Sequence, residues 1–349
     1  MKRSITLLLT VSLFSINTFA YGPRGHQLVG AIADRRLAKN KPVAKKVKAL
    51  LDGLTLERVA TFPDEIKSWD DCGRPGSNTP VTNKTRINDE LRAFWQANLC
   101  SDHPSHHDFH FTDVPVFAGE KYSDGQTGGQ FGVGRNEFDI VQMIPFCIRV
   151  LRGDEPENNP RAITKSVAVI LLAHYLGDIH QPLHVGAEYF NDQGEAFAPS
   201  IATPGFADQG GNKLTLFTFV NGKLKSAGKF HSYWDGQTVD NAFGKETNAS
   251  VAKRLAARAP SGWQLDGATD TWAVQMADDI LPVAREAHER LTFVNVKFTT
   301  GDHDIKSGQA KEVRKSGQKL YAVWAASTVK TEIQKGGWRL AALLEETLQ

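Results

Sequence analysis

The feature that most constrains the fold is an apolar run that leads directly into a His–Asp pair. Residues 164–173 are largely apolar and long enough to form a mostly buried helix, and His174 and Asp178 follow at its end. Side chains four residues apart project from the same helical face. An unpaired buried charge is very costly, so this pair needs a partner. A metal ion of the zinc type would satisfy both groups, and a simple His–Asp hydrogen bond at a helix end is the alternative.

Further donors follow nearby. His180 and His184 come soon after Asp178, and Pro182 ends the helix, so His184 should enter from a turn. A second His-x-x-x-Asp pair, His231 and Asp235, lies about fifty residues further along. One pair at this spacing alone is more simply explained as an i,i+4 hydrogen bond. Two such pairs in one chain favour a site that holds several metal ions.

The N-terminus has the pattern of a secretory signal peptide. Met1-Lys-Arg is followed by the apolar segment Ile5–Phe14 and by small residues at Thr18 and Ala20. We therefore expect residues 1–20 to be removed by cleavage between Ala20 and Tyr21, which would make the protein secreted or periplasmic. The segment is too short to span a bilayer stably, and no other apolar run is long enough, so no membrane anchor is expected. Residues 21–349 contain no repeat or low-complexity linker, which favours a single domain.

The charge balance limits how such a chain could bind nucleic acid. Loss of Lys2 and Arg3 lowers the number of basic residues from 41 to 39, which equals the 39 acidic residues. A neutral chain has no broad basic field, so any binding of nucleic acid must depend on metal ions and local contacts.

The three cysteines allow one disulfide in an oxidising compartment and leave one thiol. Cys147 lies in an apolar helical stretch, so we expect it to be the buried free thiol. Cys72–Cys100 is then the expected bridge. None of the three has zinc-finger spacing.

Helical patterns dominate the chain, which predicts a mainly α fold with a small β-hairpin and long surface loops. The hairpin is expected over 213–225 with the two-residue turn Asn221-Gly222. Long loops are expected over 186–211 and 119–134. Helices are predicted over residues 26–37, 42–51, 54–69, 136–152, 160–178, 270–290 and 312–348, the last interrupted at Gly336-Gly337.

Taken together, these residues resemble the S-one/P-one nuclease family, the secreted zinc-dependent single-strand nucleases of fungi, plants and bacteria, whose distant relatives are the zinc-dependent phospholipases C. The resemblance runs in order over nearly all of residues 21–349. It is carried by Tyr21-Gly-x-x-Gly-His26, Pro63-Asp64-Glu65-Ile66, His110-Phe-Thr-Asp113, the block from His174 to His184, Asp208-Gln-Gly-Gly-Asn212, Phe230-His231-x-x-Trp234-Asp235 and Gly337–Leu344.

The resemblance implies a mostly helical fold with three zinc ions. Asp64, His110 and His174 would hold the first, and Asp178 would bridge it to the second. The second would also take His26 and the amine and carbonyl of Tyr21, which only signal cleavage can free. The third, more exposed ion would be held by His184, His231 and Asp235, residues that the spacing of histidines and aspartates in the sequence also indicates.

The resemblance also implies a reaction. A water shared by two zinc ions attacks phosphorus, Asp64 orients it and Lys67 balances the phosphate charge, giving 5′-phosphate products. Phe111 would stack on a base and Asp113 would bind its edge, so single-stranded DNA and RNA and nucleotides are the expected partners, with 3′-nucleotidase activity in addition. Ordinary core packing is the alternative for Phe111. No obligate protein partner is predicted.

Three positions differ from the family pattern or vary within it. Tyr21 stands where Trp is usual, Lys67 stands where some members have Arg, and the loop 187–207 is longer than in many members. Residues 101–107 carry three histidines and could bind metal, but a solvated loop is favoured. Two other functions stay open at this point: a zinc-dependent phospholipase C, and a secreted zinc-binding protein without catalytic activity.

Overall fold

The computed structural model describes residues 21–71, 74–77, 79–101, 104–127, 130–301 and 303–349. The predicted signal peptide and Cys72 lie outside these residues, so cleavage and the Cys72–Cys100 bridge stay predictions. Cys147 is free and buried, as expected. Within the described ranges, no helix has both the length and the apolar character needed to cross a bilayer. The fold is mainly helical with small sheets, which confirms the predicted class.

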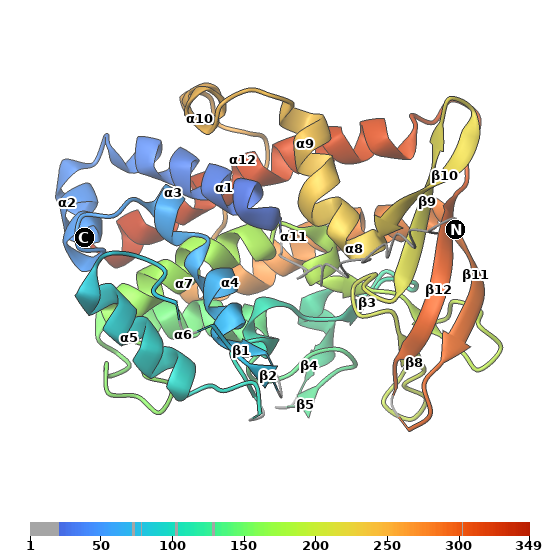
Figure 1. Ribbon diagram of the computed structural model, residues 1–349, viewed down its shortest axis with the longest axis horizontal. Helices are drawn as coiled ribbons and strands as arrows, with labels where there is room; N and C mark the ends of the chain where they lie inside the picture. The colour runs from blue at the N-terminus through green and yellow to red at the C-terminus, as the bar shows by residue number, and fades with distance from the viewer. Residues whose placement is uncertain (1–20, 72–73, 78, 102–103, 128–129, 302) are drawn as a thin grey trace, which may run out of the picture.

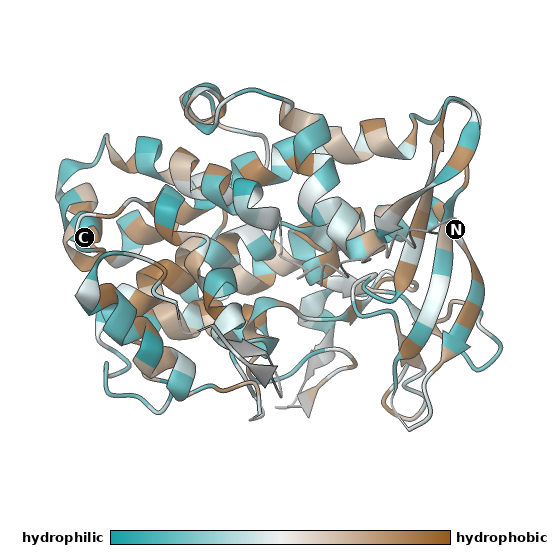
Figure 2. Ribbon diagram, in the orientation of Figure 1, coloured by the Kyte–Doolittle hydropathy of each residue, from teal (hydrophilic) through white to brown (hydrophobic). Residues whose placement is uncertain are grey.

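A buried helix, α7 (Lys165–Asp178), forms the centre of the molecule (Figure 1). It begins at Thr164, whose hydroxyl caps the helix by accepting from the Val167 amide. Every residue from Ser166 to Asp178 is buried, and this helix is mostly hydrophobic in Figure 2. A helix that is apolar all round must be enclosed by others. Here α1 (Gly22–Leu37), α6 (Ile140–Arg152) and α12 (Tyr321–Thr347) pack against it.

The last helix shows why one prediction was wrong. Gly336 and Gly337 do not interrupt α12, which runs unbroken from Tyr321 to Thr347. A Cβ on Gly336 would lie 2.9 Å from the Leu176 carbonyl oxygen of α7, and one on Gly337 would lie 2.5 Å from Ile32 Cβ of α1. The two glycines therefore permit a close crossing of three helices rather than a break. The predicted start at residue 312 was also wrong, because Glu312 ends a strand.

The helix predicted over 54–69 is divided into three pieces: α3 (Leu56–Val59), α4 (Phe62–Glu65) and the 3₁₀ turn η1 (Ile66–Trp69). Pro63 explains the division, because it has no N–H to donate to the preceding turn and its ring crowds that turn. Pro63 is tolerated here because it stands at the beginning of a new helix.

A four-stranded sheet stands at one end of the molecule, to the right in Figure 1. Its strand order is β10 (Lys223–Lys229), β9 (Leu214–Val220), β12 (Ile305–Glu312), β11 (Leu291–Phe298). The predicted hairpin is confirmed: Asn221 and Gly222 have φ of 52° and 75°, the left-handed pair that a tight two-residue turn requires. Strands β11 and β12 were not predicted.

The prediction of a surface loop over 186–211 is partly wrong. The segment contains three short buried or half-buried strands, and the side chains of Glu188 and Asp208 are buried. Strand β6 pairs in parallel with β3, while β7 pairs with β8. The loop over 119–134 likewise contains a short hairpin, β4 with β5. The strands are β3 (Val114–Pro115), β4 (Gln126–Thr127), β5 (Gln130–Phe131), β6 (Gly186–Ala187), β7 (Tyr189–Phe190) and β8 (Phe206–Ala207).

The other elements surround this core. Helices α5 and α10 were not predicted, whereas α2 and α11 match the predicted ranges to within two residues. The remaining elements, in chain order, are α2 (Lys41–Leu50), β1 (Asp70–Asp71), β2 (Arg74–Pro75), α5 (Thr85–Gln96), η2 (Asp108–His110), η3 (Tyr122–Gly125), η4 (Pro182–His184), α8 (Phe230–Ser232), the π-helix η5 (Tyr233–Gln237), α9 (Thr238–Phe243), α10 (Asn248–Ala257), η6 (Thr269–Thr271) and α11 (Trp272–Glu289).

Candidate metal centre

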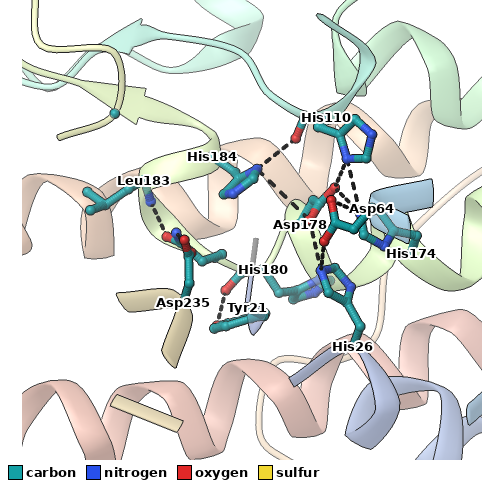
Figure 3. A network of polar contacts seen from close by, with 12 residues as sticks. Tyr21, His26, Asp64, His110, His174, Asp178, His180, Leu183, His184 and Asp235 are labelled. Carbon is teal, nitrogen blue, oxygen red and sulfur yellow. Dashed lines mark hydrogen bonds and ion pairs between the residues drawn. The ribbon is translucent and has the colours of Figure 1, made fainter. Parts of the chain in front are cut away.

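The end of α7 places the His174 and Asp178 side chains together in the protein interior (Figure 3). His174 Nδ1 lies 2.6 Å from the Ala60 carbonyl oxygen, and a carbonyl only accepts, so this nitrogen carries the hydrogen. The other nitrogen, Nε2, then presents a lone pair 3.1 Å from Asp178 Oδ2. Metal-ligating histidines typically have this arrangement, with one nitrogen bonded to a carbonyl and the other free for the metal.

Four imidazoles surround the Asp178 carboxylate. His110 Nδ1 is 2.9 Å from Oδ2, and His26 Nε2 is 3.3 Å from Oδ1. His184 Nδ1 lies farther away, 4.0 Å from Oδ1. Burial acts to raise the pKa of Asp178, but His174 and His184 outweigh it and hold that pKa well below the usual value. Asp178 is therefore an anion, which suits it to hold cations.

His26 enters this cluster from the first turns of α1. Its ring is fully buried and stacks on the ring of His174 with 3.8 Å between centroids. Gly177 makes room for it, because a Cβ there would lie 2.5 Å from His26 Nδ1. Although His26 Nε2 lies 3.3 Å from Asp178 Oδ1, neither of these atoms makes a hydrogen bond among the described residues, and nor does His26 Nδ1. Buried polar atoms without partners are costly, and a metal ion would satisfy them.

Asp64 approaches the same cluster from α4. Its Oδ1 lies 3.7 Å from His174 Nε2 and accepts a hydrogen bond of 2.8 Å from Lys67 Nζ. Burial would raise the pKa of Asp64, but Lys67 and His174 outweigh it and lower that pKa. Two overlapping donor groups that could each hold a metal ion result: Asp64, His110 and His174, and His26, His174 and Asp178.

A third donor group consists of His184, His231 and Asp235. His184 Nδ1 donates to the His110 carbonyl oxygen and His231 Nδ1 to that of Gly210, both at 2.8 Å. The two Nε2 atoms then face each other at 3.0 Å with their lone pairs. Two bare lone pairs repel, whereas a shared cation makes the arrangement favourable. Ligands of a tetrahedral zinc ion stand about 3.3 Å apart, so the donor set fits this metal.

Asp235 lies on η5, and π-helical turns often occur at functional sites. Its Oδ2 is 3.6 Å from His231 Nε2 and has no hydrogen-bond partner in the described structure, while its Oδ1 accepts from Gln181 Nε2 at 2.8 Å. Gln181 is fully buried, and its Oε1 accepts from the Leu183 amide. The sequence reasoning missed Gln181, although its position between His180 and His184 could have indicated a role.

Two predicted neighbours of the cluster have other contacts. His180 Nδ1 donates to the Leu176 carbonyl, and its Nε2 accepts from Arg339 at 2.9 Å, so this histidine belongs to none of the three groups. Tyr21 is fully buried, and its hydroxyl donates to the His180 carbonyl oxygen at 2.6 Å. The side chain of Tyr21 is thus anchored beside the cluster.

Phe111 and Asp113 extend from His110 toward the surface. The turn η2 buries His110, whereas the extended backbone at Phe111 leaves its ring 38% exposed. This exposure argues against the alternative of ordinary core packing. Asp113 is half-buried, and burial together with Asp208 and Asp304 raises its pKa to about 8. Asp113 is therefore mainly neutral at pH 7 and able to donate a hydrogen bond.

One expectation about the histidine-rich segment was wrong. His106 is buried rather than solvated, and burial lowers its pKa to about 2. Its ring packs edge-on against Phe94 and beside His107. His103 lies outside the described residues. Neither His106 nor His107 belongs to a donor group in the described part of the chain.

Comparison with known proteins places this chain in a family. The sequence model described as S1/P1 Nuclease matches residues 21–349, and the chain belongs to the S1/P1 nuclease family. Among curated proteins, Endonuclease 4 of Arabidopsis thaliana is 28% identical over 253 residues, which is 70% of this chain and 65% of the relative. Endonuclease 5 of the same plant is 28% identical over 124 residues, 35% of this chain and 34% of the relative. The matches thus span less than two thirds of the length of these relatives.

Proposed function

We propose that this protein is a secreted zinc-dependent nuclease that hydrolyses phosphodiester bonds of single-stranded DNA and RNA to 5′-phosphate products. The observation that carries the proposal is the convergence of three buried His/Asp groups, in which the ring nitrogens of His26, Asp178 Oδ1 and Asp235 Oδ2 have no hydrogen-bond partner among the described residues. Membership of the S1/P1 nuclease family supports the substrate class, and the two relatives are named endonucleases.

In this proposal each donor group holds one zinc ion. Asp64, His110 and His174 hold the first, with Asp178 shared between the first and the second. His26 holds the second, together with the amine and carbonyl of Tyr21. The match to the family begins at residue 21, which supports cleavage between Ala20 and Tyr21. The third ion is held by His184, His231 and Asp235.

When bound, zinc lowers the pKa of a coordinated water to about 7 and neutralises charge on a phosphoryl group. The residues of the chain supply the rest. Asp64 is anionic and accepts from Lys67, so it can orient the attacking water. Lys67 keeps its ammonium group beside that carboxylate, where it can contact a phosphoryl oxygen as a point charge. An arginine would make a bidentate contact instead, so Lys67 gives weaker geometric control.

Substrate recognition in this proposal begins at Phe111. An exposed aromatic ring can stack on any base for about 1–3 kcal/mol, which gives affinity without sequence specificity. A paired base would have to leave its duplex first, so single strands are preferred. Asp113, neutral below about pH 8, donates or accepts a hydrogen bond at the base edge. The same contacts would accept a nucleotide, which is the basis for 3′-nucleotidase activity.

Phe111→Ala tests this recognition. Loss of the stacking surface should raise KM for single-stranded DNA about tenfold, which corresponds to about 1.4 kcal/mol. Hydrolysis of a small phosphodiester without a base, such as bis(p-nitrophenyl) phosphate, should not change. The matched control is Phe117→Ala, which truncates another exposed ring, 54% accessible, outside the donor groups. Equal losses on both substrates would show that Phe111 is structural.

The test of the overall function is substrate choice with controlled metal. The mature protein starting at Tyr21 is assayed on denatured DNA, duplex DNA and phosphatidylcholine, before and after chelation and after zinc is restored. We expect activity on denatured DNA that chelation abolishes and zinc restores. Hydrolysis of phosphatidylcholine alone would establish a phospholipase C instead. Three bound zinc ions without hydrolysis of any substrate would establish a zinc-binding protein.

A further inference from the structure

The four-stranded sheet has an inner face on the helical body and an outer face that no helix covers in the described structure. Along β9, Leu214 and Leu216 are buried, whereas Phe217 and Phe219 on the opposite face are partly exposed. Helices α12 and α11 pack near β9 and β11, on the inner side. The outer face is therefore open to a ligand.

Strand register assembles a defined set of side chains on this outer face. Phe217 is aligned with Ser226 on β10 and with Lys311 on β12, and Lys311 Nζ lies 5.9 Å from the Phe217 ring centroid. Phe219 is aligned with Leu224, which is 40% exposed. Lys229 is aligned with Thr215 at the start of β9. We call Phe217, Phe219, Leu224, Lys229 and Lys311 the outer platform.

The charged residues of the sheet are nearly all positive. Its four strands contain six lysines and a single acidic residue, Glu312. That carboxylate is buried and accepts from the Phe219 and Tyr321 amides at 2.7 Å and 2.8 Å. No carboxylate therefore belongs to the exposed side of these strands. In a chain whose mature charge is formally zero, this is a local concentration of positive charge.

Protection of a sheet edge explains part of this pattern. Lysines on edge strands prevent pairing with other chains, and β10 is an edge strand that carries Lys223 and Lys225. Edge protection does not explain Lys311, because β12 lies inside the sheet. It also does not explain why two aromatic rings face outward from β9, another inner strand.

The platform adjoins the third donor group along the chain. Lys229 ends β10 two residues before His231, so their Cα atoms are at most about 7 Å apart. Shortly before β9 begins, the Gly210 carbonyl accepts the hydrogen bond from His231 Nδ1. A strand that lies on the platform can therefore continue toward the metal centre.

We propose that the outer platform is a second binding surface for single-stranded nucleic acid, which holds nucleotides several positions away from the bond that is cut. Lysines contact phosphates and the Phe rings stack on bases, the combination that binds single strands without sequence preference. This inference rests on the proposed nuclease function. It predicts that long strands are bound more tightly than dinucleotides.

The test replaces the two platform lysines with acids, Lys229→Glu with Lys311→Glu. We expect KM for a 30-nucleotide oligodeoxythymidylate to rise about tenfold and KM for the thymidine dinucleotide to stay unchanged. The slope of log affinity against log salt should fall by about 1.4, since each lost phosphate contact on a single strand contributes about 0.7. Phe217→Leu should raise KM for the 30-mer a few-fold without changing the salt slope, because it removes stacking only.

The matched control is Lys45→Glu with Lys48→Glu, which makes the same change in net charge at exposed positions on α2, at the other end of the molecule (Figure 1). Equal effects of the two double variants would overturn the proposal, because only net charge would then matter. Unchanged KM for the 30-mer together with lost binding to phosphatidylglycerol vesicles would also overturn it, in favour of a membrane surface. Binding is separated from catalysis by measuring the fluorescence anisotropy of the labelled 30-mer with Asp178→Asn protein, with and without the two platform substitutions. Weaker binding when Lys229→Glu and Lys311→Glu are added supports the platform even if hydrolysis is absent.

Discussion

Asp178 and Asp235 each follow a histidine by four residues, and the two carboxylates lie in opposite electrostatic surroundings. Asp178 is on a regular α-helix with four imidazoles around it, and its pKa is lowered well below the usual value. Asp235 is on a π-helix, where burial raises its pKa well above the usual value, although the Gln181 hydrogen bond and the charge of Lys67 oppose this. The same spacing therefore places one carboxylate where its neighbours favour the ionised form and the other where burial opposes that form.

The difference indicates how tightly each group would hold a cation. Asp178 is already ionised, so no proton has to leave when an ion binds. For Asp235, burial opposes the ionised form that a metal ion needs, so we expect binding at the third group to depend more strongly on pH and to be weaker. We expect the two groups around Asp178 to fill first when zinc is added to the stripped protein, and the His184, His231 and Asp235 group to fill last.

The largest expected effect comes from Asp178→Asn. The neutral amide leaves the surrounding imidazoles and cations without their shared anion, so kcat/KM should fall by at least about 10³-fold, corresponding to about 4 kcal/mol. Asp235→Asn is the matched variant and should cost about 10–100-fold, because Asp235 would serve one ion whereas Asp178 would be shared by two. Zinc content and kcat/KM of both variants are the measurements. Similar losses in the two variants would remove the contrast between the sites.

An N-terminal extension is the next test, and it should affect the second zinc ion, which shares Asp178, rather than the ion at Asp235. A residue added before Tyr21 converts its amine to an amide, which has no free lone pair for zinc. We expect the extended protein to bind two zinc ions instead of three and to lose most of its activity. The control is the mature protein with the same residue added at the C-terminus. Equal zinc stoichiometry for the extended and the native N-terminus would show that Tyr21 is not a ligand.

Gln181→Leu sharpens the comparison from the Asp235 side. It removes the hydrogen bond to Asp235 Oδ1 and leaves the Leu183 amide unpaired. Loss of a residue that orients a ligand typically lowers metal affinity about 10–100-fold. We expect the weakest of three zinc affinities to fall about tenfold while the two others stay unchanged. Gln334→Leu, which also removes side-chain amide hydrogen bonds, here to the Leu255 and Arg258 carbonyls, should leave all three affinities unchanged. A uniform loss of affinity at all sites would indicate general destabilisation.

The donor pairs could be predicted from sequence because their geometry is local. His174 with Asp178 and His231 with Asp235 lie within one helical turn, and the spacing in the chain is also the spacing in space. His26, Asp64 and His110 come from separate elements, and only the resemblance to a family connected them to α7. Their meeting at Asp178 depends on how α1, α4 and η2 pack, which no single stretch of sequence encodes.

Other features were missed for tertiary reasons. Gly336 and Gly337 read as a helix break because glycine lowers helix propensity, but close packing on Leu176 and Ile32 outweighs that preference. Strands β11 and β12 alternate weakly, since polar residues occupy both faces, and the pairing of β12 with β9 is long-range. The position of Gln181 between His180 and His184 was a local signal, but its hydrogen bond of 2.8 Å to Asp235 joins residues far apart in the sequence.

The smallest expected effect belongs to Tyr21→Phe, which separates the side chain of the first residue from its main chain. Burial, with Glu332 and Asp235 nearby, raises the pKa of the Tyr21 hydroxyl well above its usual value, so it keeps its proton and donates to His180. Removing this hydroxyl should lower the free energy of unfolding by about 1–2 kcal/mol, because the buried His180 carbonyl loses a partner.

If the main chain alone serves the metal, Tyr21→Phe keeps three zinc ions and a kcat within about twofold of wild type, while Tm falls by about 1–4 °C. Zinc analysis, steady-state kinetics and thermal unfolding of the mature protein measure these quantities together. Tyr233→Phe is the control, since its hydroxyl is buried without a hydrogen-bond partner among the described residues and its loss should cost less stability. Loss of one zinc ion in Tyr21→Phe would show that the hydrogen bond from the Tyr21 hydroxyl to His180 is needed to hold the main-chain ligands of the second ion in place.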